Sequence, residues 1–225
     1  MNYWSSFLFP WLMGLWLLLS VARRCRLPNQ GGRALLAWGA VAAALVLVPV
    51  RGLPIGRWFC VLNFQAGVPL TGLLAGHLWK MTMQREIFRP NELRTAWNFG
   101  LVFGVVLYPS ALGVGNFDVY QWGWGFSPLM LVVAVFAIVL AATGNRFSWL
   151  LVLSLLAWDA RSFETTNLWD FLVDPIFTIT AFAATVWGGP ARRCRADRPR
   201  THSKSRNPPA NQPGIGRAWD DERGI

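Results

Sequence analysis

The chain has 225 residues, of which 54% are hydrophobic and 14% charged, and its formal net charge is +10. A soluble domain carries about 25% charged residues, whereas the apolar residues here form long blocks that neither alternate nor follow an amphipathic stripe. These features exclude a soluble globular enzyme and a disordered chain. They predict an all-α membrane protein, because helices satisfy their own backbone groups in lipid.

A helix needs about 20 mostly apolar residues to cross a bilayer. We expect a polytopic bundle of about seven transmembrane helices within residues 1–187. The expected spans lie near residues 4–22, 34–50, 58–79, 96–115, 128–143, 146–163 and 168–187. The sixth segment has an uninterrupted apolar core of only 12 residues, so it either spans the membrane or is re-entrant.

The basic residues favour seven spans with the N-terminus outside and the C-terminus inside. In that arrangement 18 of the 21 Lys and Arg residues fall on one side, and only Arg51, Arg57 and Arg161 fall on the other. If the sixth segment did not cross, the split would be 10 against 11. Basic residues are retained on the cytoplasmic side. The first span lacks a basic region before it, so we expect an anchor and not a cleaved signal peptide.

Residues 188–225 are predicted to form a disordered, basic cytoplasmic tail. This segment is rich in Arg, Pro, Gly and Ser and has no apolar period. Basic residues beside a membrane attract anionic lipid headgroups by about 1 kcal/mol each. We therefore expect the partners to be the lipid bilayer, anionic headgroups bound by the tail, and another membrane protein, with no nucleic acid.

Several chemistries lack the residues that they need. The chain holds three Cys without C-x-x-C spacing, two His, and two Lys outside the last predicted helix. This composition argues against dithiol exchange, a bis-His haem, a His-rich zinc site and a retinal Schiff base. The G-x-S-x-G, P-loop and H-E-x-x-H motifs are also missing from the sequence. We expect no cofactor and assign no metal site.

Polar residues within the third and fourth predicted spans are candidates for lining a cavity. Asn63 and Gln65 lie in the third span, which is then interrupted by glycines and a proline, and Tyr108 precedes Pro109 in the fourth. Polar groups are costly in a membrane and usually serve a purpose. The two interpretations are a broken helix that lines a polar cavity and hydrogen bonding between neighbouring helices.

The external loop after the fourth span combines a carboxylate with two tryptophans. Asp118 is a candidate catalytic residue, and Trp122 and Trp124 are candidates for binding a substrate or a headgroup. Paired Trp rings can stack on a sugar or contact a lipid headgroup. The alternative interpretation is an interfacial aromatic belt, because tryptophan is enriched at every membrane interface.

The densest polar stretch joins the last two predicted spans. Asp170 and Asp174 are four residues apart, so on a helix they would share a face, and Asp174-Pro175 resembles a helix N-cap followed by proline. The last helix therefore either begins near residue 167 and kinks at Pro175, or residues 164–174 dip into the outer leaflet. Asp170 and Asp174 are candidate catalytic residues, and three others are candidate substrate or headgroup ligands: Glu164, Asn167 and Trp169.

Three roles are open for these carboxylates. They can bind a divalent cation through oxygen ligands, or carry out acid–base chemistry with raised pKa values. They can also cap helices and pair with the three external arginines, which fixes the helix ends without any reaction.

Three motifs resemble those of uncharacterised bacterial multi-pass inner-membrane proteins: LYPSALG at residues 107–113, NFD at 116–118 and NLWDFLVDP at 167–175. The resemblance implies the inner membrane of a bacterial cell envelope and a link to glycan or lipid modification. The leading hypothesis is a non-catalytic accessory or scaffold component in envelope biogenesis. The alternatives are a small carrier of a polar or lipid-linked substrate, and an intramembrane transferase that uses the external carboxylates.

Overall fold

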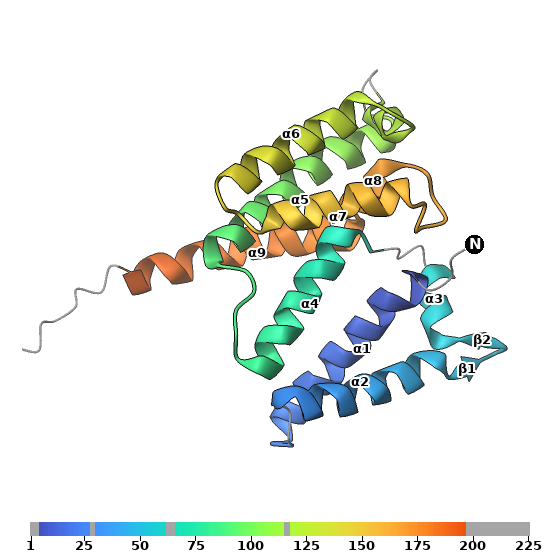
Figure 1. Cartoon of the computed structure of the whole chain (residues 1–225), viewed down its shortest axis with the longest axis vertical. Coiled ribbons are helices and arrows are strands. Elements are labelled where there is room, and N and C mark those ends of the chain that lie inside the picture. The colour runs from blue at the N-terminus through green and yellow to red at the C-terminus, as the bar shows by residue number, and fades with distance from the viewer. Residues whose placement is uncertain (1–4, 28–29, 62–65, 115–117, 197–225) are drawn as a thin grey trace, which may run out of the picture.

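The computed structural model describes residues 5–27, 30–61, 66–114 and 118–196, and it confirms the predicted all-α class (Figure 1). A two-stranded hairpin, β1 (Pro49–Val50) and β2 (Leu53–Pro54), interrupts the helices. The helices in chain order are α1 (Ser5–Arg24), α2 (Gly31–Leu47), α3 (Ile55–Val61), α4 (Val68–Met83), α5 (Pro90–Ala111), the 3-10 helix η1 (Val119–Gly123), α6 (Pro128–Ala142), α7 (Phe147–Asp159), α8 (Leu168–Leu172) and α9 (Pro175–Ala196).

The helices form two groups that meet across α4. One group contains α1 to α4 and the other contains α5 to α9, and α4 packs on both α1 and α7 (Figure 1). The β1–β2 hairpin, η1 and α8 all lie along the right-hand side of the molecule in Figure 1, which we call the η1 end. The turns after α1, α4 and α6 lie at the opposite end, where Arg23 of α1 donates to the carbonyl of Met81 in α4.

Close contact between α5 and α9 depends on two glycines. Gly100 lies against the ring of Phe177, and a Cβ on Gly104 would lie 2.9 Å from the Cβ of Thr178. Phe177 is fully buried and belongs to the main hydrophobic core, together with Phe99 and Phe147 of α5 and α7. The two glycines therefore set how closely the helices approach.

Replacing Gly104 with alanine is expected to destabilise the protein by about 1–3 kcal/mol, because the added methyl group overpacks a buried contact. Thermal unfolding measures this change. Ala40→Leu is a suitable control, since Ala40 is exposed on α2. Equal melting temperatures for Gly104→Ala and the wild type would contradict this close packing.

A buried carboxylate fixes two helix starts at the opposite end. Glu92, which is 5% exposed, accepts hydrogen bonds from the backbone N–H of Arg89 at 2.6 Å and of Arg146 at 3.3 Å. Arg89 and Arg146 are the N-cap residues of α5 and α7. The N-termini of two helices thus share one negative charge, which stabilises both.

Large hydrophobic side chains cover much of the outside of the molecule. The helix α6 carries exposed Leu131, Val135 and Ile138 on one side and buried Leu129 and Val133 on the other. By length and hydropathy, one described helix is suited to cross a membrane by itself, through residues Phe7–Arg24 of α1. Four shorter apolar helical segments accompany it: Gly31–Leu47, Pro128–Ala142, Phe147–Asp159 and Pro175–Trp187.

Two of the predicted spans do not coincide with single helices in the structure. Instead of one helix over 58–79, α3 ends at Val61 and α4 begins at Val68. Near the last span, α8 covers only residues 168–172, and α9 begins at Pro175 and continues to Ala196. The expectation that Asp170 and Asp174 share a helix face is therefore wrong, because Val173 is extended and ends α8 between them. Of the predicted tail, residues 197–225 lie outside the described part of the chain.

Candidate functional site

The polar residues of the predicted external loops meet at the η1 end, where Asn167 joins η1 to α8. Asn167 is fully buried. Its side-chain amide donates to the carbonyl of Tyr120 at 3.2 Å, and its side-chain oxygen accepts from the N–H of Trp169 at 3.0 Å. Asn167 is therefore the N-cap of α8, and it also holds η1 in place.

Trp169 makes the second link between these two elements. Its indole N–H donates to the carbonyl of Val119 at 3.0 Å, and its ring is 2% exposed. Phe103 of α5 packs on this ring at a centroid distance of 5.9 Å. Asn167 and Trp169 were candidates for binding a substrate or headgroup, but both side chains are buried and form hydrogen bonds within the protein.

Gly123, which the sequence analysis did not single out, makes this junction possible. A Cβ at this position would lie 2.6 Å from the side-chain carbon of Asn167 and 2.8 Å from the indole of Trp169. Gly123 is the last residue of η1, and the next residue, Trp124, forms an isolated β-bridge with Asn167. We call the contacts of residues 119–124 with residues 165–170 the η1–α8 clasp.

Asp170 lies at the edge of the clasp and is half-buried. Its carboxylate accepts from the hydroxyl of Thr165 at 2.6 Å and from the phenol of Tyr120 at 3.3 and 3.4 Å. Burial, followed by the negative charge of Asp170, raises the pKa of Tyr120 to about 12. The phenol therefore stays protonated at neutral pH and can only donate to Asp170.

Asp174 is 4% exposed and joins two helices from different parts of the chain. One carboxylate oxygen accepts from the N–H of Gly67 at 2.8 Å, and the other accepts from the N–H of Phe177 at 2.8 Å. Gly67 is the N-cap of α4, and Phe177 lies in the first turn of α9. The predicted capping role of Asp174 at Pro175 is confirmed, and the carboxylate also caps α4.

Asp170 and Asp174 have separate surroundings, since Asp170 faces η1 and Asp174 lies between α4 and α9. Among the described residues, no three His, Cys, Asp or Glu side chains come together as a metal site. Lys80 and Glu86 form an ion pair at the opposite end.

The remaining candidates lie apart from the clasp core or on the surface. Asp118 accepts from the N–H of Tyr120 at 3.0 Å and caps η1, while Glu164 is exposed. Trp122 and Trp124 are 39% and 52% exposed, and Phe126 is exposed as well. The half-buried Tyr108 packs against the core. Asn63 and Gln65 lie outside the described residues.

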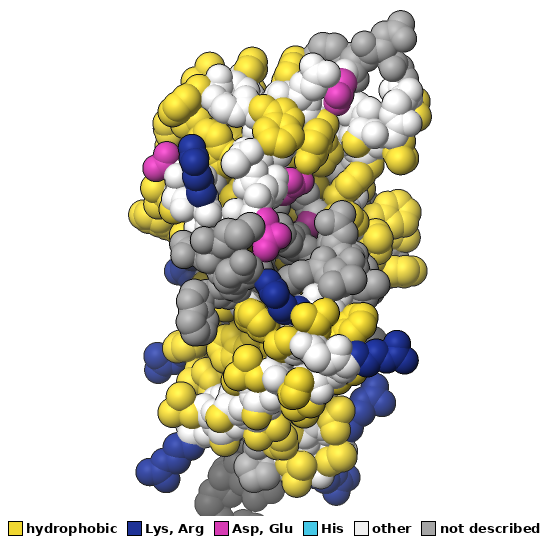
Figure 2. Space-filling view, turned by 90° about the vertical axis from the view of Figure 1, so that its right-hand side faces the viewer, with side chains coloured by type: hydrophobic (Ala, Val, Ile, Leu, Met, Phe, Trp, Pro, Cys, Tyr) yellow, Lys and Arg dark blue, Asp and Glu magenta, His cyan; other side chains and the backbone are white. Residues whose placement is uncertain are grey.

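Figure 2 shows the η1 end face on, with its visible carboxylates in the upper half of the view and hydrophobic side chains over much of the lower half. Sequence comparisons add no relative: no family model matches the chain, and neither a curated protein nor a solved structure matches it.

Proposed function

We propose that this chain is a multi-pass integral membrane protein of about seven helices. The observation that carries the proposal is α6, which is apolar around its whole circumference although one side is exposed. A helix that is hydrophobic all round needs an apolar environment on every side. The sequence around it has no charged residue between Asp118 and Arg146.

The spans proposed are α1, α2, α4, α5, α6, α7 and α9, with α3 and α8 as short segments at the η1 end. Some of these helices are short, since the 15 residues of α6 cover only about 22 Å at 1.5 Å per residue. A bilayer adjusts to a short helix by thinning locally, and flanking aromatic residues anchor the helix ends. Trp122, Trp124 and Phe126 are suited to this role before α6.

The proposed location is a bacterial inner membrane, with the η1 end outside. The three basic residues predicted to be external are found in the β1–β2 turn, in α3 and directly after α7: Arg51, Arg57 and Arg161. The other described basic residues lie near the ends of α1, α4 and α9 or near the starts of α2, α5 and α7. This distribution agrees with retention of positive charge in the cytoplasm.

Membrane insertion and orientation are tested together by cysteine labelling. In a variant without native cysteines, we expect Gly52→Cys in the β1–β2 turn to react with a membrane-impermeant maleimide added to intact spheroplasts. Arg200→Cys in the tail should react only after the membrane is opened. The protein should also stay in the membrane during alkaline carbonate extraction. Labelling of position 200 from outside would contradict the proposed orientation.

We further propose that the protein is a non-catalytic accessory or scaffold component in envelope biogenesis. This proposal is supported by the hydrogen bonds of three polar side chains predicted to be external. Asn167, Asp170 and Asp174 all form hydrogen bonds with other groups of the same chain. The exposed surface around Glu164, Trp122 and Trp124 then remains for a partner or a headgroup. Affinity purification in mild detergent tests this role, since a scaffold should co-purify with a stoichiometric membrane partner.

A further inference from the structure

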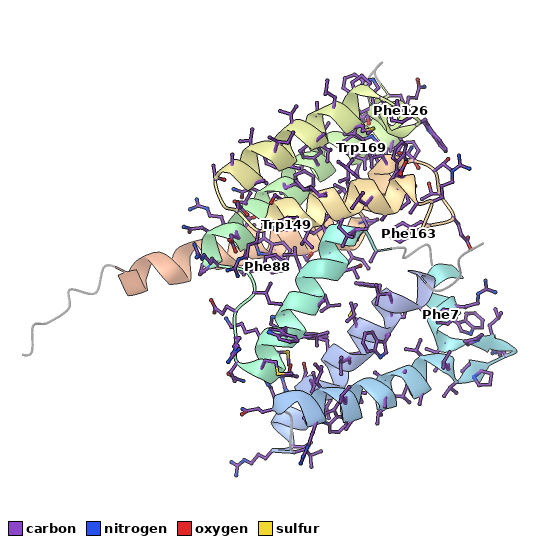
Figure 3. The ribbon with its side chains drawn as sticks, viewed as in Figure 1. Phe7, Phe88, Phe126, Trp149, Phe163 and Trp169 are labelled. Carbon is purple, nitrogen blue, oxygen red and sulfur yellow. The ribbon has the colours of Figure 1, made fainter. Side chains whose placement is uncertain are left out.

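A cavity of about 440 Å³ lies between α1, α4 and α7. Its floor is formed by the small side chains of α4, including Thr71, Gly72 and Ala75. The cavity lies along the line where the α1–α4 group meets the α5–α9 group. In Figure 3, Phe163 lies on that line, with the ribbon of α8 above it and the ribbons of α1 and α3 below it.

The residues that line the cavity favour a hydrocarbon ligand. Among the described residues that line the cavity, none is charged, and the hydroxyl groups belong to Thr71 and Ser162. The Thr71 hydroxyl already donates to the carbonyl of Gly67 at 3.0 Å. Water gains little in such a space because it lacks polar partners, while the volume lies within the range of small-molecule sites, about 300–1,000 Å³.

The cavity opens sideways, on the apolar flank of the molecule. Three lining residues on different helices remain exposed: Leu8 on α1, Ala75 on α4 and Leu153 on α7. The apolar surface continues beyond the opening along α7 through exposed Trp149 and Leu156. In the membrane-embedded protein proposed above, this flank faces lipid tails.

We propose that the cavity holds one acyl chain of a phospholipid from the leaflet at the η1 end. The segments that line it are the first turns of α1, the first half of α4 and the last half of α7, which all lie toward that end. The bound chain fills the space between the two helix groups and thereby completes their packing. The inference rests on the proposed membrane location, and it names the lipid that this location supplies.

Photolabelling of the wild-type protein in liposomes tests the site directly. The probe is a phosphatidylethanolamine with a diazirine on one acyl chain, and the labelled residues are located by peptide mapping. We expect excess labelling of residues 66–75 and 153–163 over the exposed faces of α2 and α6. Native mass spectrometry of the detergent-solubilised protein should show one retained phospholipid on each protein molecule.

Two variants fill the cavity from opposite walls. Ala75→Phe and Ala157→Phe should each abolish the excess labelling and the retained phospholipid. Ala40→Phe is the matched control, because it adds the same ring to an exposed alanine on α2 away from the cavity, and it should leave both signals unchanged. Size-exclusion chromatography and the melting temperature show which variants keep the fold.

The outcomes separate this inference from the membrane proposal. Extraction of the wild-type protein by carbonate would overturn the membrane proposal itself. A carbonate-resistant protein with uniform labelling of α2, α6 and the cavity segments would overturn the acyl-chain site alone. A retained free fatty acid, a second copy of the chain on this face, or excess labelling that persists in folded Ala75→Phe and Ala157→Phe would likewise overturn it.

Discussion

Replacing Asp174 with alanine is expected to lower the melting temperature of the detergent-solubilised protein by about 5–15 °C. The substitution leaves the buried N–H groups of Gly67 and Phe177 without an acceptor. Each unsatisfied buried donor costs about 1–3 kcal/mol. The loss also removes a negative charge from the start of two helices, which adds to the destabilisation.

Asp174→Asn should be intermediate between the wild type and Asp174→Ala. The amide keeps one oxygen for one of the two N–H groups, but it presents its own NH₂ to the other. Asp159→Ala serves as the control, since Asp159 is an exposed carboxylate at the end of α7, and it should leave the melting temperature unchanged. The cellular amount of the Asp174 variants should also fall.

The same variants separate a structural carboxylate from a catalytic one. If Asp174 acted as a general acid or base, Asp174→Asn would abolish function at a normal protein level and with a wild-type melting temperature. That combination would contradict the role in capping. A parallel loss of stability and amount is expected from the hydrogen bonds that the buried carboxylate accepts.

Gly123→Ala is expected to disrupt the η1–α8 clasp and to destabilise the protein by more than about 2 kcal/mol. The new methyl group would collide with Asn167, which is fully buried and hydrogen-bonded to both Tyr120 and Trp169. The collision moves either η1 or the start of α8. Compared with the wild type, amide hydrogen exchange should accelerate more in residues 119–124 and 165–172 than in the rest of the protein.

Gly125→Ala provides a comparison two residues away. Gly125 has a φ of +67° but no atom within 4 Å of the position of a Cβ, so alanine there costs only backbone strain, about 1–2 kcal/mol. Gly123→Ala and Asn167→Ala together should destabilise the protein by less than the sum of the two single substitutions, because the second removes the side chain with which the first collides. Strict additivity of the two substitutions would contradict the contact.

The sequence predicted local features of the η1 end better than its contacts. Asp174-Pro175 was predicted as a helix start from local residue types, and the N–H of Phe177 confirms it. The second partner, Gly67, lies 107 residues earlier in the chain, and no local pattern encodes such a contact. The sequence left open whether the last helix begins near residue 167 or at Pro175. In the structure, tertiary hydrogen bonds hold separate segments on the two sides of Val173.

The two tryptophans of the external loop illustrate the same limit. Trp122 and Trp124 alternate with Gly123 and Gly125, and the sequence does not distinguish the two glycines. The structure requires Gly125 for its positive φ and Gly123 for its proximity to Asn167. Crowding at Gly123 is a property of the assembled fold, whereas the exposed positions of both Trp rings agree with the interfacial belt predicted as one alternative.

The bond between Asp174 and Gly67 also sets an order of events during synthesis. A ribosome completes α4 long before it reaches residue 174, so the N–H of Gly67 has no acceptor from α9 while the intervening helices are made. The α1–α4 group can already pack on α7 at that stage, but its hydrogen bond to residue 174 forms only late. A chain halted before α9 would leave that amide without its acceptor and would expose the apolar surface that α9 covers on α5. Proteases in the cell act on such incompletely folded states.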